Sequence, residues 1–118
     1  MDAALPLIDR EELRQKVDAG VDFVLVDAMG PVSFARSHLP GAVNITPEWI
    51  DERARRRIPD PDTEVVVYCA GEDCESSIAV GNRLLELGYT NVRHYAGGKR
   101  EWEEAGLPLE GGRTRTAR

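Results

Sequence analysis

Two short runs of apolar residues constrain the fold of this chain more than any other feature. They read FVLVDA at residues 23–28 and EVVVYC at residues 64–69, and neither alternates regularly between apolar and polar residues. A strand without that alternation is buried on both faces, as the central strands of a parallel sheet are. Because a helical pattern follows each run, we expect strands that alternate with covering helices.

The other elements predicted from the sequence fit this arrangement. We expect further strands at residues 42–45 and 91–97, a helix from its N-cap residue Asp9 to Gly20, and later helices over residues 31–38, 47–57, 76–88 and 97–106. The predicted class is α/β, with a central parallel sheet of four to five strands and helices on both faces. We expect one domain over residues 1–110 and a mobile tail over residues 111–118.

The charge and composition of the chain limit the classes of partner that it is expected to bind. Its 118 residues carry a net charge of −6, which disfavours binding to nucleic acid or to an anionic membrane. No apolar run is long enough to span a bilayer, and the first residues lack the pattern of a signal peptide. We therefore expect a cytoplasmic protein, whose two cysteines are reactive thiols or small buried residues rather than a structural disulfide.

Cys69 ends the second apolar run, and a helix is predicted to begin a few residues later. In open parallel sheets, ligands bind beyond the carboxyl ends of the strands, so this position makes Cys69 a candidate site. Backbone N–H groups at the start of a helix would favour its thiolate form. The alternative is a small buried residue at a strand end, because cysteine is among the most buried residue types.

Three longer segments, at residues 24–45, 65–92 and 95–111, carry further motifs. The first holds a strand, an aspartate and the sequence HLPGA; the second holds the strand, cysteine loop and helix; the third holds paired glycines, a tryptophan and glycine–x–proline. In this order they resemble a single-domain rhodanese, a rhodanese-like sulfurtransferase domain, over nearly the whole chain. The resemblance implies that Cys69 is catalytic, accepting a sulfane sulfur as a persulfide and passing it to a thiol or cyanide. It also implies an active-site loop formed by Ala70, Gly71, Glu72, Asp73, Cys74, Glu75 and Ser76.

The loop departs from the family pattern in its charge. Rhodaneses commonly carry an arginine about five residues after the cysteine, and often another two residues after the aspartate of the first segment. Here these places hold Cys74 and Met29, and the loop contains Glu72, Asp73 and Glu75 without a basic residue. We therefore expect a dianionic donor such as thiosulfate to bind poorly. The alternative is that these carboxylates point into solvent and have no effect.

Positive charge could reach the site from other segments. Arg36, Lys99 and Arg100 follow strands at the same edge of the sheet and are candidate contacts for a charged substrate, the alternative being ordinary surface charges. A cysteine phosphatase or an arsenate reductase would need an arginine in the loop itself to hold its oxyanion, and the loop has none.

Cys74 is a candidate resolving thiol, because two thiols in a short loop can close an intramolecular disulfide. The alternative is that it packs into the start of the following helix. Asp27 and His38 are interpreted as structural residues near the site: the resemblance implies that Asp27 accepts backbone hydrogen bonds, and His38 is read as a hydrogen-bonded scaffold residue, the alternative being a base. The two tryptophans, Trp49 and Trp102, are interpreted as core anchors. We expect no cofactor, and no metal site because the spacing of cysteines and histidines matches no zinc motif.

These observations favour a rhodanese-like sulfurtransferase. Its expected partners are a small sulfur donor and a thiol acceptor, which could include a protein acceptor, but not nucleic acid or a membrane. The alternative hypothesis is a catalytically weak rhodanese-like module that binds a protein partner or senses redox state through Cys69 and Cys74.

Overall fold

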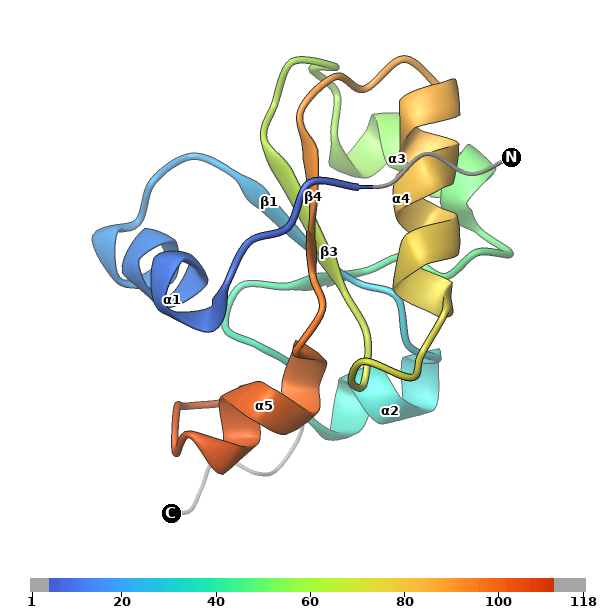
Figure 1. The fold of residues 1–118 in the computed structure, drawn as a ribbon. Coiled ribbons are helices and arrows are strands. Elements are labelled where there is room, and N and C mark those ends of the chain that lie inside the picture. The colour runs from blue at the N-terminus through green and yellow to red at the C-terminus, as the bar shows by residue number, and fades with distance from the viewer. Residues whose placement is uncertain (1–4, 112–118) are drawn as a thin grey trace.

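The protein is described by a computed structural model that covers residues 5–111 and places four parallel strands in one sheet (Figure 1). The strand order is β2-β1-β3-β4, which confirms the predicted α/β class. Apart from Gly111, the expected mobile tail lies outside the described residues. The elements in chain order are α1 (Arg10–Ala19), β1 (Val24–Asp27), α2 (Pro31–Arg36), β2 (Val43–Asn44), α3 (Ile50–Arg57), β3 (Val65–Tyr68), α4 (Ser76–Glu86), β4 (Val92–Tyr95) and α5 (Gly98–Glu104).

The register of the strands brings the candidate site to one edge of the sheet. Asp27, Tyr68 and Tyr95 are partners across the neighbouring strands β1, β3 and β4. Each is the last residue of its strand, so the segments that follow these strands meet at the carboxyl edge. Cys69 directly follows β3, the central strand, whose four residues are all buried.

Helices cover both faces of the sheet, as the two apolar runs predicted. On one face α3 and α4 pack against the strands, and Leu84 of α4 lies in the same core as Val65. On the other face α1 and α5 contribute Leu13 and Trp102 to a second core that includes Val66. Figure 1 shows α1 and α4 on opposite sides of the sheet. Residues 65 and 66 are adjacent, so their side chains point to opposite faces and both must be apolar.

The start of α3 differs from the sequence prediction. The helix begins at Ile50 rather than at Pro47, because Trp49 donates its backbone N–H to the carbonyl oxygen of Thr46 at 3.0 Å and closes a turn. Trp49 is 45% exposed, and the guanidinium of Arg53 lies 5.0 Å from the centre of its ring. The prediction that Trp49 anchors the core was therefore wrong, whereas Trp102 is buried as expected.

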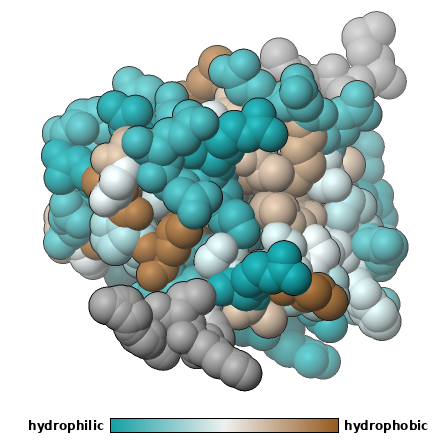
Figure 2. All heavy atoms as spheres, turned by 90° about the horizontal axis from the view of Figure 1, so that it is seen from below, coloured by the Kyte–Doolittle hydropathy of each residue, from teal (hydrophilic) through white to brown (hydrophobic). Residues whose placement is uncertain are grey.

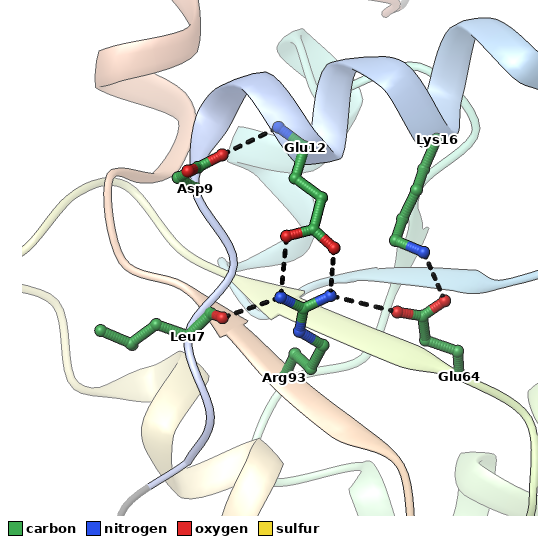
Figure 3. Close-up of polar contacts among 6 residues, drawn as sticks. All are labelled: Leu7, Asp9, Glu12, Lys16, Glu64 and Arg93. Atoms are coloured by element: carbon green, nitrogen blue, oxygen red, sulfur yellow. Dashed lines mark hydrogen bonds and ion pairs between the residues drawn. The ribbon is translucent and has the colours of Figure 1, made fainter.

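Charged side chains fix α1 against the sheet (Figure 3). Asp9 caps the helix by accepting the backbone N–H of Glu12 at 2.8 Å. In a capping box the Glu12 carboxylate would accept the backbone N–H of Asp9. Here it accepts two hydrogen bonds from Arg93 instead, at 2.7 and 3.0 Å. Arg93 also donates to the carbonyl oxygen of Leu7 at 3.0 Å, so β4 is joined to both α1 and the segment before it.

The same network continues to the start of β3. Arg93 lies 3.6 Å from Glu64, which pairs with Lys16 at 2.8 Å. Glu64 precedes β3 and Cys69 follows it, so these ion pairs stabilise the end of the sheet opposite to Cys69. Within residues 5–111, none of the helices is both long enough and apolar enough to cross a membrane.

Candidate active site

Cys69 lies at the base of a loop that α5 holds in place. The Cys69 side chain is buried, and the residue is 3% exposed. Its carbonyl oxygen accepts the N–H of Lys99 at 2.9 Å, and the carbonyl oxygen of Ala70 accepts the N–H of Arg100 at 2.9 Å. The first turn of α5 therefore fixes the two residues with which the loop begins.

Gly98 makes this contact possible. Its φ of +67° lies in the left-handed region, and a Cβ built on it would lie 2.6 Å from the carbonyl oxygen of Cys69. The same Cβ would lie 2.8 Å from backbone atoms of Ala70 and Gly71. Gly98, the second of the paired glycines, therefore allows close packing between α5 and the loop.

The structure joins Cys69 and Cys74 in a disulfide, with their Cα atoms 6.1 Å apart. A turn in which Cys74 donates its N–H to the carbonyl oxygen of Gly71, at 3.2 Å, brings the two cysteines together. The sequence predicted thiols rather than a structural disulfide, whereas the structure pairs the two cysteines; this places Cys74 within reach of Cys69, as a resolving thiol requires. A free thiolate at Cys69 therefore requires that this bond be reduced.

The acidic residues of the loop are all exposed. Glu72 and Asp73 border a cavity of about 250 Å³ that lies between the loop and α5, and Glu101 and Glu104 border it from the helix. Glu75 faces solvent outside this cavity. Figure 2 shows the lower face of the molecule: hydrophilic side chains cover much of it, and hydrophobic atoms occur in separate patches.

The three candidate cations occupy different positions. Lys99 donates from Nζ to the carbonyl oxygen and Oγ of Ser37, at 3.1 and 3.0 Å, so its charge is directed toward the loop after α2. Arg100 lies against the active-site loop: a Cβ built on Gly71 would be 3.6 Å from its guanidinium carbon. Arg36 is exposed at the end of α2. Of the three, Arg100 is the one whose guanidinium packs on residues 69–76.

Asp27 and Tyr68 form a buried polar pair beside Cys69. The Tyr68 hydroxyl donates to Asp27 Oδ2 at 2.7 Å and accepts the N–H of Leu39 at 3.0 Å. Asp27 Oδ1 accepts the N–H of Met29 at 2.8 Å. Burial raises the pKa of the Asp27 carboxyl, and these two hydrogen bonds oppose that rise. The pair holds the loop after β1 and the turn at Leu39 against the end of β3.

Sequence reasoning assigned backbone hydrogen bonds to Asp27 but missed Tyr68. The sequence did contain a signal for this contact, because a tyrosine inside an apolar run needs a hydrogen-bond partner for its buried hydroxyl group. A second missed contact joins His94 Nε2 to Ser77 Oγ at 2.9 Å and connects β4 to the first turn of α4. Burial lowers the pKa of His94.

His38 contributes to the scaffold around the site. Its Nδ1 donates to the carbonyl oxygen of Phe34 at 2.7 Å, and its ring stacks on that of Phe34 with centroids 3.9 Å apart. The backbones of His38 and Glu110 exchange two hydrogen bonds, at 2.7 and 2.8 Å, which tie the C-terminal segment to the chain after α2. Across residues 5–111, no group of three or more His, Cys, Asp or Glu side chains is arranged to hold a metal ion.

We expect Tyr68→Phe to lower the free energy of unfolding by about 1–3 kcal/mol, because it leaves Asp27 Oδ2 and the N–H of Leu39 without their buried partner. Urea unfolding measures this loss. Tyr95→Phe is the matched control, since the Tyr95 hydroxyl makes one hydrogen bond, to Glu101, in a less buried setting. Equal losses in the two variants would contradict the role assigned to Tyr68.

The effect of Tyr68→Phe should also depend on pH. The pKa of Asp27 is raised in the folded state, so the contribution of Asp27 to stability is largest below its unfolded pKa and falls as pH rises through the folded pKa. The Tyr68 hydrogen bond favours the ionised carboxyl. The loss in Tyr68→Phe should therefore be larger at neutral pH and shrink as Asp27 is protonated.

Known proteins resemble this chain in both sequence and fold. Residues 9–105 match the model of the rhodanese-like domain. A protein named sulfurtransferase, from Allochromatium vinosum, is 33% identical over 103 residues, which span 86% of this chain and 92% of that protein. The HTH-type transcriptional regulator Rv0324 of Mycobacterium tuberculosis is 31% identical over 105 residues, or 89% of this chain, but the match spans only 45% of the regulator. The structure of the human single-domain sulfurtransferase TSTD1 superimposes with a TM-score of 0.73 at 27% identity, covering 86% of this chain and 97% of that one.

Proposed function

Because the chain belongs to the rhodanese-like domain family, we propose that it is a sulfurtransferase that carries a persulfide on Cys69. The observation that supports this most directly is the place of Cys69, which directly follows the inner strand β3 at the carboxyl edge with its loop bound to α5. The Cys69 thiolate attacks the sulfane sulfur of a donor, and the bond between that sulfur and the rest of the donor breaks. An acceptor thiolate or cyanide then takes the outer sulfur, and Cys69 leaves as a thiolate.

The start of α4 supports the charge on the thiolate. The helix begins at Ser76, and Glu75 at its N-cap position makes no side-chain hydrogen bond to it. The Glu75 side chain thus leaves the first N–H groups of the helix unsatisfied, and these groups favour a nearby anion. The carboxylates of Glu72 and Asp73 act in the opposite direction on an anionic donor.

The test is the intact mass of the reduced protein after incubation with thiosulfate, 3-mercaptopyruvate or a low-molecular-weight persulfide. We expect a gain of one sulfur atom, removed again by a thiol or by cyanide. A protein that takes up no sulfur from any of the three donors would contradict the proposal.

The disulfide favours a second candidate function, a redox-sensing module that uses Cys69 and Cys74. We expect the reduced protein to be a dithiol that mild peroxide converts to the disulfide, with the loss of two hydrogen atoms from the protein and the release of water. Sulfur loading should stop on oxidation and return with reductant. Oxidation of Cys69 to the sulfinic acid while Cys74 stays a free thiol would rule the sensor out. A reversible disulfide without any sulfur turnover would favour the sensor over the enzyme.

A further inference from the structure

Helix α3 concentrates positive charge in an acidic chain. Residues 53–57 hold four arginines, although the net charge of the chain is −6. The helix packs on the core through Ile50 and Ala54. Three of the four arginines are exposed, and the fourth, Arg53, is partly buried. The charge therefore gathers on the surface of one short helix.

Three of these arginines lie beside one another and beside an aromatic ring. Arg56 and Arg57 follow Arg53 by three and four positions, so all three are neighbours on the helix surface, where they border a hollow of about 360 Å³. Trp49 lies one turn before Arg53 and is 45% exposed, and the Arg53 guanidinium lies 5.0 Å from the centre of its ring. We call Trp49, Arg53, Arg56 and Arg57 the arginine row.

The described part of the chain offers the arginine row no acidic partner. Among residues 5–111, no carboxylate lies within 4.0 Å of these three guanidinium groups. Asp51 of the same helix pairs with Arg83 of α4 instead, at 2.7 Å. The helix dipole favours cations in the last turn, but it does not require that they adjoin an exposed tryptophan. Like charges at this spacing repel one another, so an anionic partner would stabilise the row.

The arginine row lies away from the active-site loop. Helix α3 ends at Arg57, and the carbonyl oxygen of the next residue, Ile58, accepts the Tyr89 hydroxyl at 2.6 Å. Tyr89 shortly precedes β4, so this contact lies at the end of the sheet where the strands begin, whereas Cys69 follows the opposite end of β3. Figure 1 shows α3 near the top of the view and α2 and α5 at the bottom. A segment bound along the row therefore leaves the active-site loop uncovered.

We propose that the arginine row docks a short acidic segment of a partner protein, whose carboxylates pair with the three guanidinium groups. Arginine and tryptophan are among the residue types that carry most of the binding energy in protein interfaces. The planar guanidinium binds a carboxylate through two parallel hydrogen bonds. A helix rises about 12 Å over the eight steps from residue 49 to residue 57, which is the length of about four extended residues. The inference does not depend on the proposed sulfurtransferase function.

A nucleic acid matches this surface less well than an acidic segment does. Acids border the row along the chain, because Glu48 precedes Trp49 and both Asp60 and Asp62 follow the helix. A phosphate backbone that extends past the row would meet these carboxylates and the net negative charge of the chain. A short segment can end before it reaches them.

A fluorescein-labelled peptide with four consecutive glutamates between glycines is the probe, and fluorescence anisotropy measures its binding. We expect Arg53→Gln/Arg56→Gln/Arg57→Gln to weaken binding at least about fivefold, because it removes three ion pairs at an exposed surface. High salt should weaken binding to the wild type in the same direction. The same peptide with glutamine in place of glutamate should bind more weakly than either.

The matched control removes the same charge from α1 and α2, as Arg10→Gln/Arg14→Gln/Arg36→Gln. It should change peptide binding by less than about twofold, because charges beyond a Debye length are largely screened. Equal losses in the two triple variants would show that the peptide responds to net charge alone and would overturn the inference.

The two tryptophans locate the bound peptide. Trp49 belongs to the row, whereas Trp102 is buried in the core on the other face of the sheet and donates from Nε1 to the carbonyl oxygen of Pro108 at 2.8 Å. The peptide should shift the indole N–H signal of Trp49 in NMR spectra and leave that of Trp102 in place. An unchanged Trp102 signal in the triple variants also shows that the fold is intact.

The other possible occupants are outcomes of the same test. If a short oligothymidylate bound as tightly as the acidic peptide, the row would be a nucleic-acid site and the inference would be wrong. If the wild type dimerised in sedimentation experiments and the α3 triple variant did not, the occupant would be a second copy of this chain. A Trp49 signal that the peptide does not move would also overturn the inference. Binding is measured without a sulfur donor, so its outcome is independent of sulfur transfer.

Discussion

Cys69→Ser is expected to abolish sulfur loading, with a loss on the order of a thousandfold or more, because it removes the proposed nucleophile. Serine is close in size to cysteine, and the hydrogen bonds from α5 to residues 69 and 70 involve backbone carbonyl groups that the substitution retains. The variant lacks the disulfide and should therefore fold as the reduced wild type does. Its hydroxyl group is scarcely ionised at neutral pH, so it cannot attack a sulfane sulfur as a thiolate does.

Cys74→Ser is the matched control for this prediction. Cys74 lies in the turn that starts at Gly71, and its substitution removes the disulfide without changing the end of β3. We expect it to retain most sulfur loading and to lose the reversible inactivation by peroxide. Intact mass after exposure to donor measures both variants. If Cys74→Ser abolished loading and Cys69→Ser preserved it, the nucleophile would have been assigned to the wrong cysteine.

Sequence patterns predicted the parts of this fold that depend on local burial. The apolar runs before Asp27 and Cys69 identified β1 and β3, and the position of Cys69 at a strand end followed from them. Asp9 caps α1 as its residue type and position predicted. These features depend on neighbours in the chain, so a single sequence carries enough information for them.

The sequence did not predict contacts that depend on how distant elements meet. Tyr68 reaches Asp27 because β1 and β3 pair in a register that places these residues side by side. Glu12, three residues after the N-cap residue Asp9, accepts from Arg93, which lies 81 positions away in the sequence. Such pairs require the relative placement of strands and helices, which no local pattern specifies.

The position of Arg100 shows the same limit within the site. Sequence reasoning placed three cations at the correct edge but could not distinguish among them. The structure separates them because the first turn of α5 donates its N–H groups to the carbonyl groups of Cys69 and Ala70. That contact brings Arg100 onto Gly71, while the side chain of Lys99 reaches Ser37. The guanidinium that lies against the loop thus comes from a helix that follows the loop by more than twenty residues.

Gly98→Ala is expected to disrupt the active-site loop, because its new Cβ would overlap backbone atoms that cannot move independently of the loop. That Cβ would lie 2.6 Å from the carbonyl oxygen of Cys69 and 2.8 Å from backbone atoms of Ala70 and Gly71. The φ of +67° adds a cost of about 1–2 kcal/mol for any residue with a Cβ. We expect a total loss of at least about 3 kcal/mol in the free energy of unfolding. The hydrogen bonds from Lys99 and Arg100 to the loop should break, and sulfur loading should fall sharply.

Gly20→Ala isolates the effect of the overlap from the effect of the backbone angle. Gly20 has the same φ of +67°, but a Cβ built on it meets nothing within 4 Å, and it lies at the end of α1. This control should lose only the backbone cost of about 1–2 kcal/mol and should keep its sulfur loading. Urea unfolding and intact mass after donor treatment measure the two quantities in both variants. If Gly98→Ala matched Gly20→Ala in both, contact between α5 and the loop would not be what holds Cys69 in its reactive position.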